Sequence, residues 1–258
     1  MGSSGPSKSP FPNPQSRVPF TLFISDLHLS QDTPAANEAL LKFLEQTAPR
    51  SDAVYVLGDL FEYWIGDDGL EHPFARRIAD AFRRLSDGGV PLYFMHGNRD
   101  FLIGERFARE SGMKILEDPT MVNLYGRPTL LMHGDTLCSD DLEYQKFRAM
   151  VRNPAWQQAF LAKPLVERAR MAQDVRGRSE QAKQVKDLAI MDVAPATVET
   201  VLRKHAYPRL IHGHTHRPAR HEHVVDGRLC ERWVLADWYG QGSYLVCDAA
   251  GCRAMPIK

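Results

Sequence analysis

Five short apolar runs, each followed at once by a cluster of polar residues, constrain the fold of this chain more than any other feature. The runs begin at Phe20, Ala53, Leu92, Thr129 and Arg209. Continuous apolar runs of this kind are typical of strands that are buried on both faces of a sheet. We therefore expect five such strands, over residues 20–24, 53–57, 92–95, 129–132 and 209–211.

Helical patterns separate the first three of these runs. Apolar residues recur at helical spacing over residues 39–44 and again over 74–85. Alternation of strands and helices favours an α/β fold with parallel pairing. Because such folds bind ligands beyond the carboxyl ends of their strands, we expect the five polar clusters to meet at one site.

The pattern changes to helices without strands over residues 141–190, which we interpret as a helical insertion in a domain that covers residues 20–258. The insertion carries ten Lys and Arg residues against six Asp and Glu residues. Short apolar runs at 233–235 and 244–246 are expected to lie in a second sheet. Residues 1–19 are rich in Ser and Pro and are expected to form a disordered tail.

Composition narrows the class of protein. The 258 residues include 32 Lys and Arg against 32 Asp and Glu, and this balance argues against duplex DNA as the main partner. The four cysteines form no Cys-x-x-Cys pair and are expected to be reduced thiols of a cytosolic protein. No run approaches the ~18 consecutive apolar residues that a membrane span needs. We therefore expect a cytoplasmic protein.

Seven residues of the polar clusters are candidate metal ligands, because they supply two carboxylates, one amide and four imidazoles. They are Asp26, His28, Asp59, Asn98, His133, His214 and His216. The set suits Mn, Fe or Zn in place of a cysteine-bound structural zinc. Seven ligands are too many for one ion, but they suit two ions about 3.5–4 Å apart that share a carboxylate. A single Asp or His at a strand end is usually a turn or surface residue, so the case depends on the recurrence at five strand ends.

The same clusters carry a family resemblance. In chain order they read Asp26-x-His28, Gly58-Asp59, Gly97-Asn98-Arg99-Asp100, His133-Gly134-Asp135 and Gly213-His214-Thr215-His216. This ordered set resembles the calcineurin-like metallophosphoesterases. The resemblance implies a four-layer αββα sandwich in which the insertion forms a cap.

The resemblance also implies roles for individual residues. One ion would be held by Asp26, His28, Asp59 and His216. The other would be held by Asp59, Asn98, His133 and His214, with Asp59 as the bridge. The residues implied in catalysis are Asp59, Asn98, Arg99, His133 and His214.

Arg99 departs from the pattern of many phosphomonoesterases in this group, which have His after the Gly-Asn pair. A histidine there can protonate an alcohol leaving group, which benefits from a general acid. A phosphate monoester, with a second pKa of about 6, can leave as an anion. An arginine can hold its oxygens in bidentate fashion. We therefore expect a diphosphate substrate.

Longer stretches give a closer resemblance, to the UDP-2,3-diacylglucosamine pyrophosphohydrolases of bacterial lipid A biosynthesis. These stretches are residues 24–29, 57–62, 64–68, 96–102, 132–138 and 188–193. The resemblance implies hydrolysis of UDP-2,3-diacylglucosamine to UMP and 2,3-diacylglucosamine 1-phosphate, with two Mn(II) ions and with water attacking the uridine-side phosphorus. It implies a peripheral protein on the cytoplasmic face of the inner membrane. Its partners would be the UDP-linked lipid and the membrane surface, with no nucleic acid and no protein partner.

Substrate contacts are implied for several residues, although some members have Asn where Lys183 stands. They are Asn98, Arg99, Asp141, Ser179, Lys183, Lys186 and His214. Arg176, Ser179, Lys183 and Lys186 also recur at helical spacing and would share one face, which a solvated basic face would explain equally. Apolar residues of the insertion are expected to shelter the acyl chains, or to pack only the insertion's own core: Trp156, Phe160, Leu161, Leu165 and Val166.

Two alternatives remain open from the sequence. The chain could be a metallophosphoesterase that acts on another nucleotide or phosphoester. It could also be a non-catalytic metal-binding module of the same fold, although such a module can lose ligands and all seven are present here.

Overall fold

The computed structural model describes residues 18–185, 192–240 and 242–257, with residues 178–185 described by their backbone only. The expected tail, residues 1–19, lies outside the described residues except for Val18 and Pro19. Lys186 also lies outside them.

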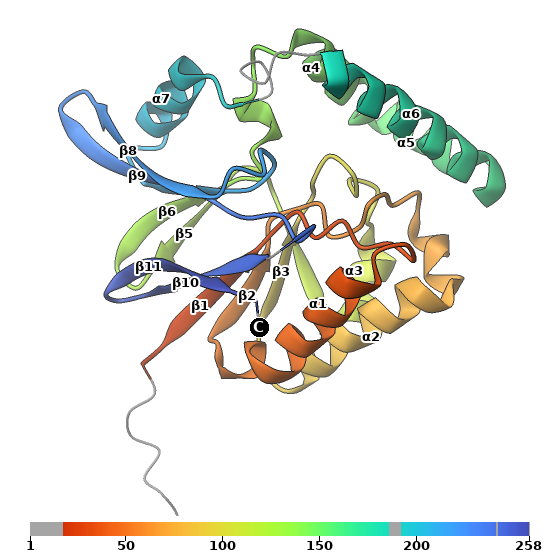
Figure 1. Cartoon of the computed structure of the whole chain (residues 1–258), viewed down its shortest axis with the longest axis horizontal. Coiled ribbons are helices and arrows are strands. Elements are labelled where there is room, and N and C mark those ends of the chain that lie inside the picture. Colours follow the sequence, from red (N-terminus) through yellow and green to blue (C-terminus); the bar gives the residue numbers. More distant parts are fainter. Residues whose placement is uncertain (1–17, 186–191, 241, 258) are drawn as a thin grey trace, which may run out of the picture.

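Two mixed sheets form the centre of the protein (Figure 1). The first has the strand order β11-β10-β1-β2-β3-β4 and contains β1 (Phe20–Ile24), β2 (Ala53–Val56), β3 (Leu92–Met95), β4 (Met113–Leu116), β10 (Ser243–Asp248) and β11 (Gly251–Pro256). The second has the order β5-β6-β7-β9-β8 and contains β5 (Thr120–Leu124), β6 (Arg127–Leu131), β7 (Arg209–His212), β8 (Ala219–Val225) and β9 (Arg228–Val234). Strands β1 to β4 run parallel, as do β6, β7 and β9, so the predicted parallel pairing is confirmed.

Helices cover the outer face of each sheet. Helices α1 (Pro34–Gln46), α2 (Pro73–Asp87) and α3 (Glu105–Ser111) cover the first sheet, and α7 (Pro195–Lys204) covers the second. In β1, Leu22 and Ile24 pack toward α1 and α2, whereas Phe23 packs between the two sheets. Successive side chains of a strand face opposite sides, so a strand with helices on one side and a sheet on the other must be apolar throughout. The predicted αββα order of layers is confirmed.

Three further helices lie between β6 and β7 and stand apart from the sheets in Figure 1: α4 (Leu142–Val151), α5 (Pro154–Leu161) and α6 (Leu165–Val185). Pro154 opens α5, where its missing N–H costs nothing, and the Asn153 side chain caps the helix by accepting from Ala155 N at 2.9 Å. Arg168 attaches α6 to the body of the protein through the Asp68 carboxylate and the Ile65 carbonyl. Among the described residues, no helix has both the length and the apolar character needed to cross a bilayer.

Short 3₁₀ turns complete the described elements at Ala48–Arg50, Asp67–Glu71 and Asp135–Leu137. The structure also contains β4, β5, β8 and β11, which the sequence analysis did not predict. These strands alternate buried and exposed residues or lie at a sheet edge, so they lack a continuous apolar run. The run at 244–246 lies in β10 of the first sheet, so its assignment to the second sheet was wrong. A short apolar run does not specify which sheet edge will pair with it.

The expectation of four reduced cysteines was also wrong. Cys247 and Cys252 lie directly opposite each other in the β10–β11 hairpin and form a disulfide. Cys138 and Cys230 are free and buried. The pairing depends on the hairpin register, which the sequence analysis had not recognised.

Candidate metal centre

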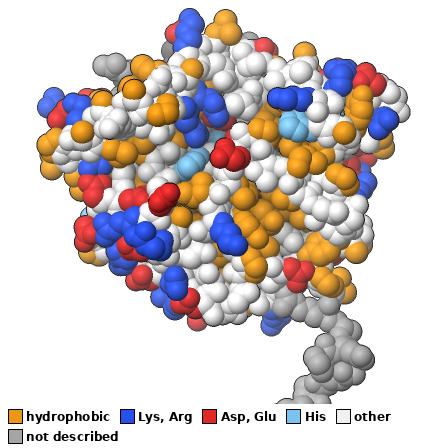
Figure 2. All heavy atoms as spheres, turned by 180° about the vertical axis from the view of Figure 1, so that it is seen from behind, with side chains coloured by type: hydrophobic (Ala, Val, Ile, Leu, Met, Phe, Trp, Pro, Cys, Tyr) orange, Lys and Arg blue, Asp and Glu red, His pale blue; other side chains and the backbone are white. Residues whose placement is uncertain are grey.

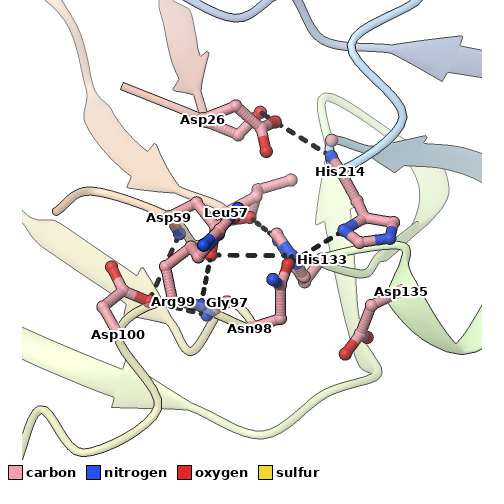
Figure 3. Close-up of polar contacts among 12 residues, drawn as sticks. Asp26, Leu57, Asp59, Gly97, Asn98, Arg99, Asp100, His133, Asp135 and His214 are labelled. Atoms are coloured by element: carbon pink, nitrogen blue, oxygen red, sulfur yellow. Dashed lines mark hydrogen bonds and ion pairs between the residues drawn. The ribbon is translucent and has the colours of Figure 1, made fainter. Parts of the chain in front are cut away.

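The seven predicted ligands meet at the carboxyl ends of strands from both sheets. Figure 3 shows five of them, Asp26, Asp59, Asn98, His133 and His214. Asp26 and His28 follow β1, Asp59 lies just beyond β2, and Asn98 follows β3 of the first sheet. The second sheet supplies His133 after β6, and His214 and His216 after β7. The site therefore lies where the two sheets face each other, and neither sheet contains it alone.

One group of donors consists of Asp26, His28 and His216. The Nε2 atoms of His28 and His216 lie 3.1 Å apart, and His216 Nε2 lies 3.4 Å from Asp26 Oδ1. That carboxylate oxygen is buried and has no hydrogen-bond partner among the described residues. Buried polar atoms rarely lack a partner, so this oxygen fits the role of a ligand to a cation.

A second group surrounds Asn98. Its side-chain oxygen lies 3.1 Å from His133 Nε2 and 3.0 Å from His214 Nδ1. Asp59 lies between the two groups, with Oδ2 at 3.9 Å from His28 Nε2 and Oδ1 at 3.8 Å from His133 Nε2. Each oxygen of this one carboxylate therefore faces a different group of ligands.

The donor set fits divalent metal ions. Ligand atoms of Asp26, His28 and His216 all lie within 4.8 Å of one another, and so do those of Asp26, Asp59 and His133. Oxygen and imidazole nitrogen donors without thiolates suit Mn, Fe or Zn. The imidazole nitrogens of the first group also converge on a carboxylate, as ligands of a common ion would.

The backbone at the site adopts a conformation that ordinary residues rarely take. The φ angles of Asp26, His28, Asp59, His214 and His216 all lie between 49° and 71°. Such positions cost energy for residues other than glycine and cluster at functional sites, where the surrounding structure enforces them. Five of the seven candidate ligands share this feature, which supports a common function.

Glycines let the loops of the site approach each other closely. A Cβ atom on Gly97 would clash with Asp59 Oδ1, and one on Gly213 would clash with Asp26 Oδ2. The glycines that precede Asn98 and His214 are therefore needed for packing the ligand loops against the carboxylates of the first two strands.

Several residues without an assigned role hold the ligands in place. Glu62 Oε2 lies 3.3 Å from His28 Nδ1, and Asp237 Oδ2 lies 3.5 Å from His216 Nδ1. The Leu57 carbonyl lies 2.9 Å from His133 Nδ1, which leaves Nε2 of that ring free for a ligand bond. Asp100 accepts backbone N–H groups of Gly97 and Leu60, at 2.9 and 2.7 Å. Glu62 and Asp100 fall within the quoted motifs, whereas nothing in the sequence pointed to Asp237.

Burial and charge shift the titration of the site. Burial raises the pKa of Asp26, but the contact with the His216 imidazole and the charge of His133 outweigh it and hold the pKa well below the usual range. Burial lowers the pKa of His133, but the charges of Asp59, Asp135 and Asp26 raise it to about 9. Carboxylates packed this densely favour a bound cation.

An apolar cavity adjoins the metal centre. Aromatic side chains of the body and of the insertion line it, together with Val175: Trp64, Phe101, Phe147, Trp156 and Phe160. Asn98, Arg99, Glu62 and Arg176 lie at its polar boundary. Trp156 and Phe160 thus face a cavity next to the metal ligands, whereas Leu161, Leu165 and Val166 are exposed.

Only some of the predicted substrate-binding residues lie at the candidate metal centre. Asn98, Arg99 and His214 lie at the site, and Arg99 donates its backbone N–H to Asp59 Oδ1 at 2.8 Å. Asp141 caps helix α4 by accepting from Tyr144 N at 3.1 Å. Ser179 and Lys183 belong to α6, but their side chains are not described, and Lys186 lies outside the described residues.

The sequence from residue 21 to residue 218 matches the family model described as Calcineurin-like phosphoesterase. Curated relatives resemble nearly the whole chain. A protein of Aromatoleum aromaticum named UDP-2,3-diacylglucosamine hydrolase is 54% identical over 230 residues, which cover 89% of this chain and 94% of that protein. A protein of the same name from Stenotrophomonas maltophilia is 52% identical, over 90% of this chain and 96% of that protein. One from Aeromonas salmonicida is 52% identical, over 88% and 89% of the two chains.

Proposed function

This chain belongs to the calcineurin-like phosphoesterases, and from that premise we propose that it is a metal-dependent enzyme that hydrolyses the pyrophosphate bond of UDP-2,3-diacylglucosamine to UMP and 2,3-diacylglucosamine 1-phosphate. The relatives named for this substrate match both the body and the insertion of the chain. One observation supports the assignment: the seven predicted metal ligands lie together beside an apolar cavity that the insertion helps to line.

The proposed cofactors are two divalent ions, with Mn(II) as the expected metal. Asp26, His28 and His216 would hold one ion, while Asn98, His133 and His214 would hold the other. Asp59 would bridge them, which agrees with its two oxygens facing one group each. When bound, such ions supply positive charge that lowers the pKa of an attacking water and neutralises charge developing on the phosphoryl oxygens.

The chain's own residues fix the reacting groups. Glu62 and the Leu57 carbonyl orient the His28 and His133 rings through their Nδ1 atoms. Arg99, whose side chain is 17% exposed, lies 3.8 Å from Glu62 Oε1 at the boundary of the apolar cavity and would hold the oxygens of the departing lipid phosphate. No general acid is needed at this position because the lipid phosphate leaves as an anion.

The cavity supports one orientation of the substrate. Two acyl chains gain about 25 cal/mol per Å² on leaving water, so they should enter the space lined by Trp64, Trp156 and Phe160. The lipid phosphate then faces Arg99 and Arg176 at the polar boundary of that space. This orientation places the uridine-side phosphorus at the metal centre for attack by water.

We place the enzyme on the cytoplasmic face of the inner membrane, where its lipid substrate would be found. Exposed apolar residues at the α5–α6 turn, Leu161, Leu165 and Val166, lie beside Lys163. In the rear view, hydrophobic and basic side chains are interspersed over the surface formed by the insertion (Figure 2). Such a surface suits contact with anionic lipid headgroups.

Product analysis in isotopically heavy water tests the proposal. The protein with Mn(II) should convert UDP-2,3-diacylglucosamine to UMP and the lipid monophosphate, with the heavy oxygen in UMP. Label in the lipid monophosphate would contradict attack on the uridine-side phosphorus. Turnover of other nucleotides or phosphoesters in place of this lipid would support the broader phosphoesterase alternative, and metal binding without any turnover would support the non-catalytic module.

A further inference from the structure

Helix α4 of the insertion contacts the loops that carry two of the metal ligands. Residues 144, 148 and 152 are spaced by four and therefore lie on one face, from the first turn of this helix to its C-cap. Tyr144 OH and Arg148 Nε both donate to Asp135 Oδ2, at 2.6 and 2.7 Å. Asp135 is fully buried and follows His133 by two residues. The insertion thereby holds the loop that presents His133.

Arg152, the residue that caps the end of α4, reaches the second loop. Its Nη2 atom donates to the Gly97 carbonyl at 2.8 Å, and its guanidinium lies 5.2 Å from the centre of the Phe101 ring. The Gly97 carbonyl belongs to the peptide unit that leads into Asn98, so this hydrogen bond fixes the orientation of the Asn98 backbone. Asp100 holds the same segment from the other side by accepting from Gly97 N at 2.9 Å.

The positive charge of Arg152 gives the fold no evident stabilisation. Arg152 forms no ion pair with any carboxylate of the described residues, and its buried Nε atom has no hydrogen-bond partner there. A partly buried charge without an ion pair adds little to stability, and an apolar replacement of similar volume is often neutral or stabilising. The hydrogen bond to the Gly97 carbonyl points instead to a role in positioning the loop that carries Asn98.

We propose that Arg152 is a positioning residue for the second metal ion, the one assigned to Asn98, His133 and His214. This inference rests on the proposed function, because it assumes two ions. The first group is supported differently, by Glu62 behind His28 and Asp237 behind His216. Replacing Arg152 should therefore lower the affinity for the second ion and leave the affinity for the first ion unchanged.

The test measures binding of Mn(II) alone to the full chain, by equilibrium dialysis and electron paramagnetic resonance. The parent should bind two ions and show the spectrum of a coupled manganese pair. R152M should keep the first ion with the parent's affinity, bind the second about ten- to a hundredfold more weakly, and show the spectrum of isolated Mn(II) at concentrations that saturate the parent. Without added metal, its thermal midpoint should stay close to the parent's.

R168M is the matched control, because Arg168 attaches α6 to Asp68 and the Ile65 carbonyl, away from the predicted ligands. It should bind both ions like the parent. R152Q runs in parallel, so that a polar replacement is available should R152M not fold, and it too should lose affinity for the second ion.

Parent-like binding of two ions by R152M and R152Q would overturn the inference and leave the proposed function standing. An equal loss of affinity for the second ion in R168M would also overturn it. That result would show that metal binding depends on attachment of the insertion in general and not on Arg152. A parent that binds a single ion would overturn the two-ion centre itself, and this inference with it.

Discussion

Glu62 is not one of the predicted ligands, but its carboxylate contacts several residues at the candidate metal centre. Its Oε2 atom lies 3.3 Å from His28 Nδ1 and accepts from Tyr239 OH at 2.8 Å. Its Oε1 atom lies 3.3 Å from Arg176 Nε and 3.8 Å from Arg99 Nη1. Burial raises the pKa of Glu62, but the hydrogen bond with His28 and the charge of Arg99 outweigh it and lower the pKa to about 2. A single carboxylate thus connects a candidate metal ligand with the two arginines at the cavity boundary.

Replacing Glu62 by Gln should weaken the ion held by His28. The variant keeps the size of the side chain but loses the charge that orients the imidazole, so affinity for the first Mn(II) should fall about ten- to a hundredfold. Equilibrium dialysis of Mn(II) measures this. Glu71→Gln, which changes an exposed residue paired with Arg106, should bind like the parent. Unchanged binding in the Glu62 variant would remove its role in holding His28.

At the scale of elements, sequence patterns predict best where both faces of a strand are buried. Strands β1, β2, β3, β6 and β7 have continuous apolar runs for this reason, and the polar residues at their ends led to the seven ligands. Edge strands such as β5 alternate in burial and give a weaker signal. Contacts that hold the candidate ligands in place cannot be found from local sequence patterns. Tyr239 and Glu62, for example, are separated by 177 positions and meet only in the folded chain. The same holds for the pairing of β10 with β1.

The cavity face of helix α6 allows a test of lipid binding. Val175 lines the cavity and is 44% exposed, so Val175→Glu should fold while placing a carboxylate where an acyl chain would lie. Burying that charge is unfavourable, and kcat/KM for the diacylated substrate should fall at least tenfold. Hydrolysis of a short water-soluble diphosphate should change little.

Val166→Glu supplies the matched control on the same helix. Val166 is 82% exposed and does not line the cavity, so this variant adds the same charge outside it. With a detergent-solubilised substrate it should resemble the parent. Equal losses in both variants, or equal losses on both substrates, would contradict binding of the acyl chains in this cavity.

At the scale of the whole molecule, the candidate metal centre lies between the two sheets. Asp26, Asp59 and Asn98 come from the first sheet, whereas His133 and His214 come from the second. The sheets also pack through a shared apolar layer that includes Phe23, Leu131 and Ile211, so the fold does not depend on metal alone. Ions bound between the sheets would add cross-links at the end of the sandwich where the ligand loops meet.

Removing the metal should therefore lower thermal stability without unfolding the protein. Ligand present at a hundred times its Kd stabilises the native state by about 2.7 kcal/mol, which corresponds to roughly 5–10 °C in a domain of this size. Thermal denaturation followed by circular dichroism, with chelator and then with added Mn(II), measures the shift. Asp59→Ala lacks the carboxylate that faces both groups, so it should lose activity and show little response to Mn(II). A response equal to the parent's in this variant would show that the stabilising ions bind elsewhere, and an unresponsive parent would mean that metal does not cross-link the sheets.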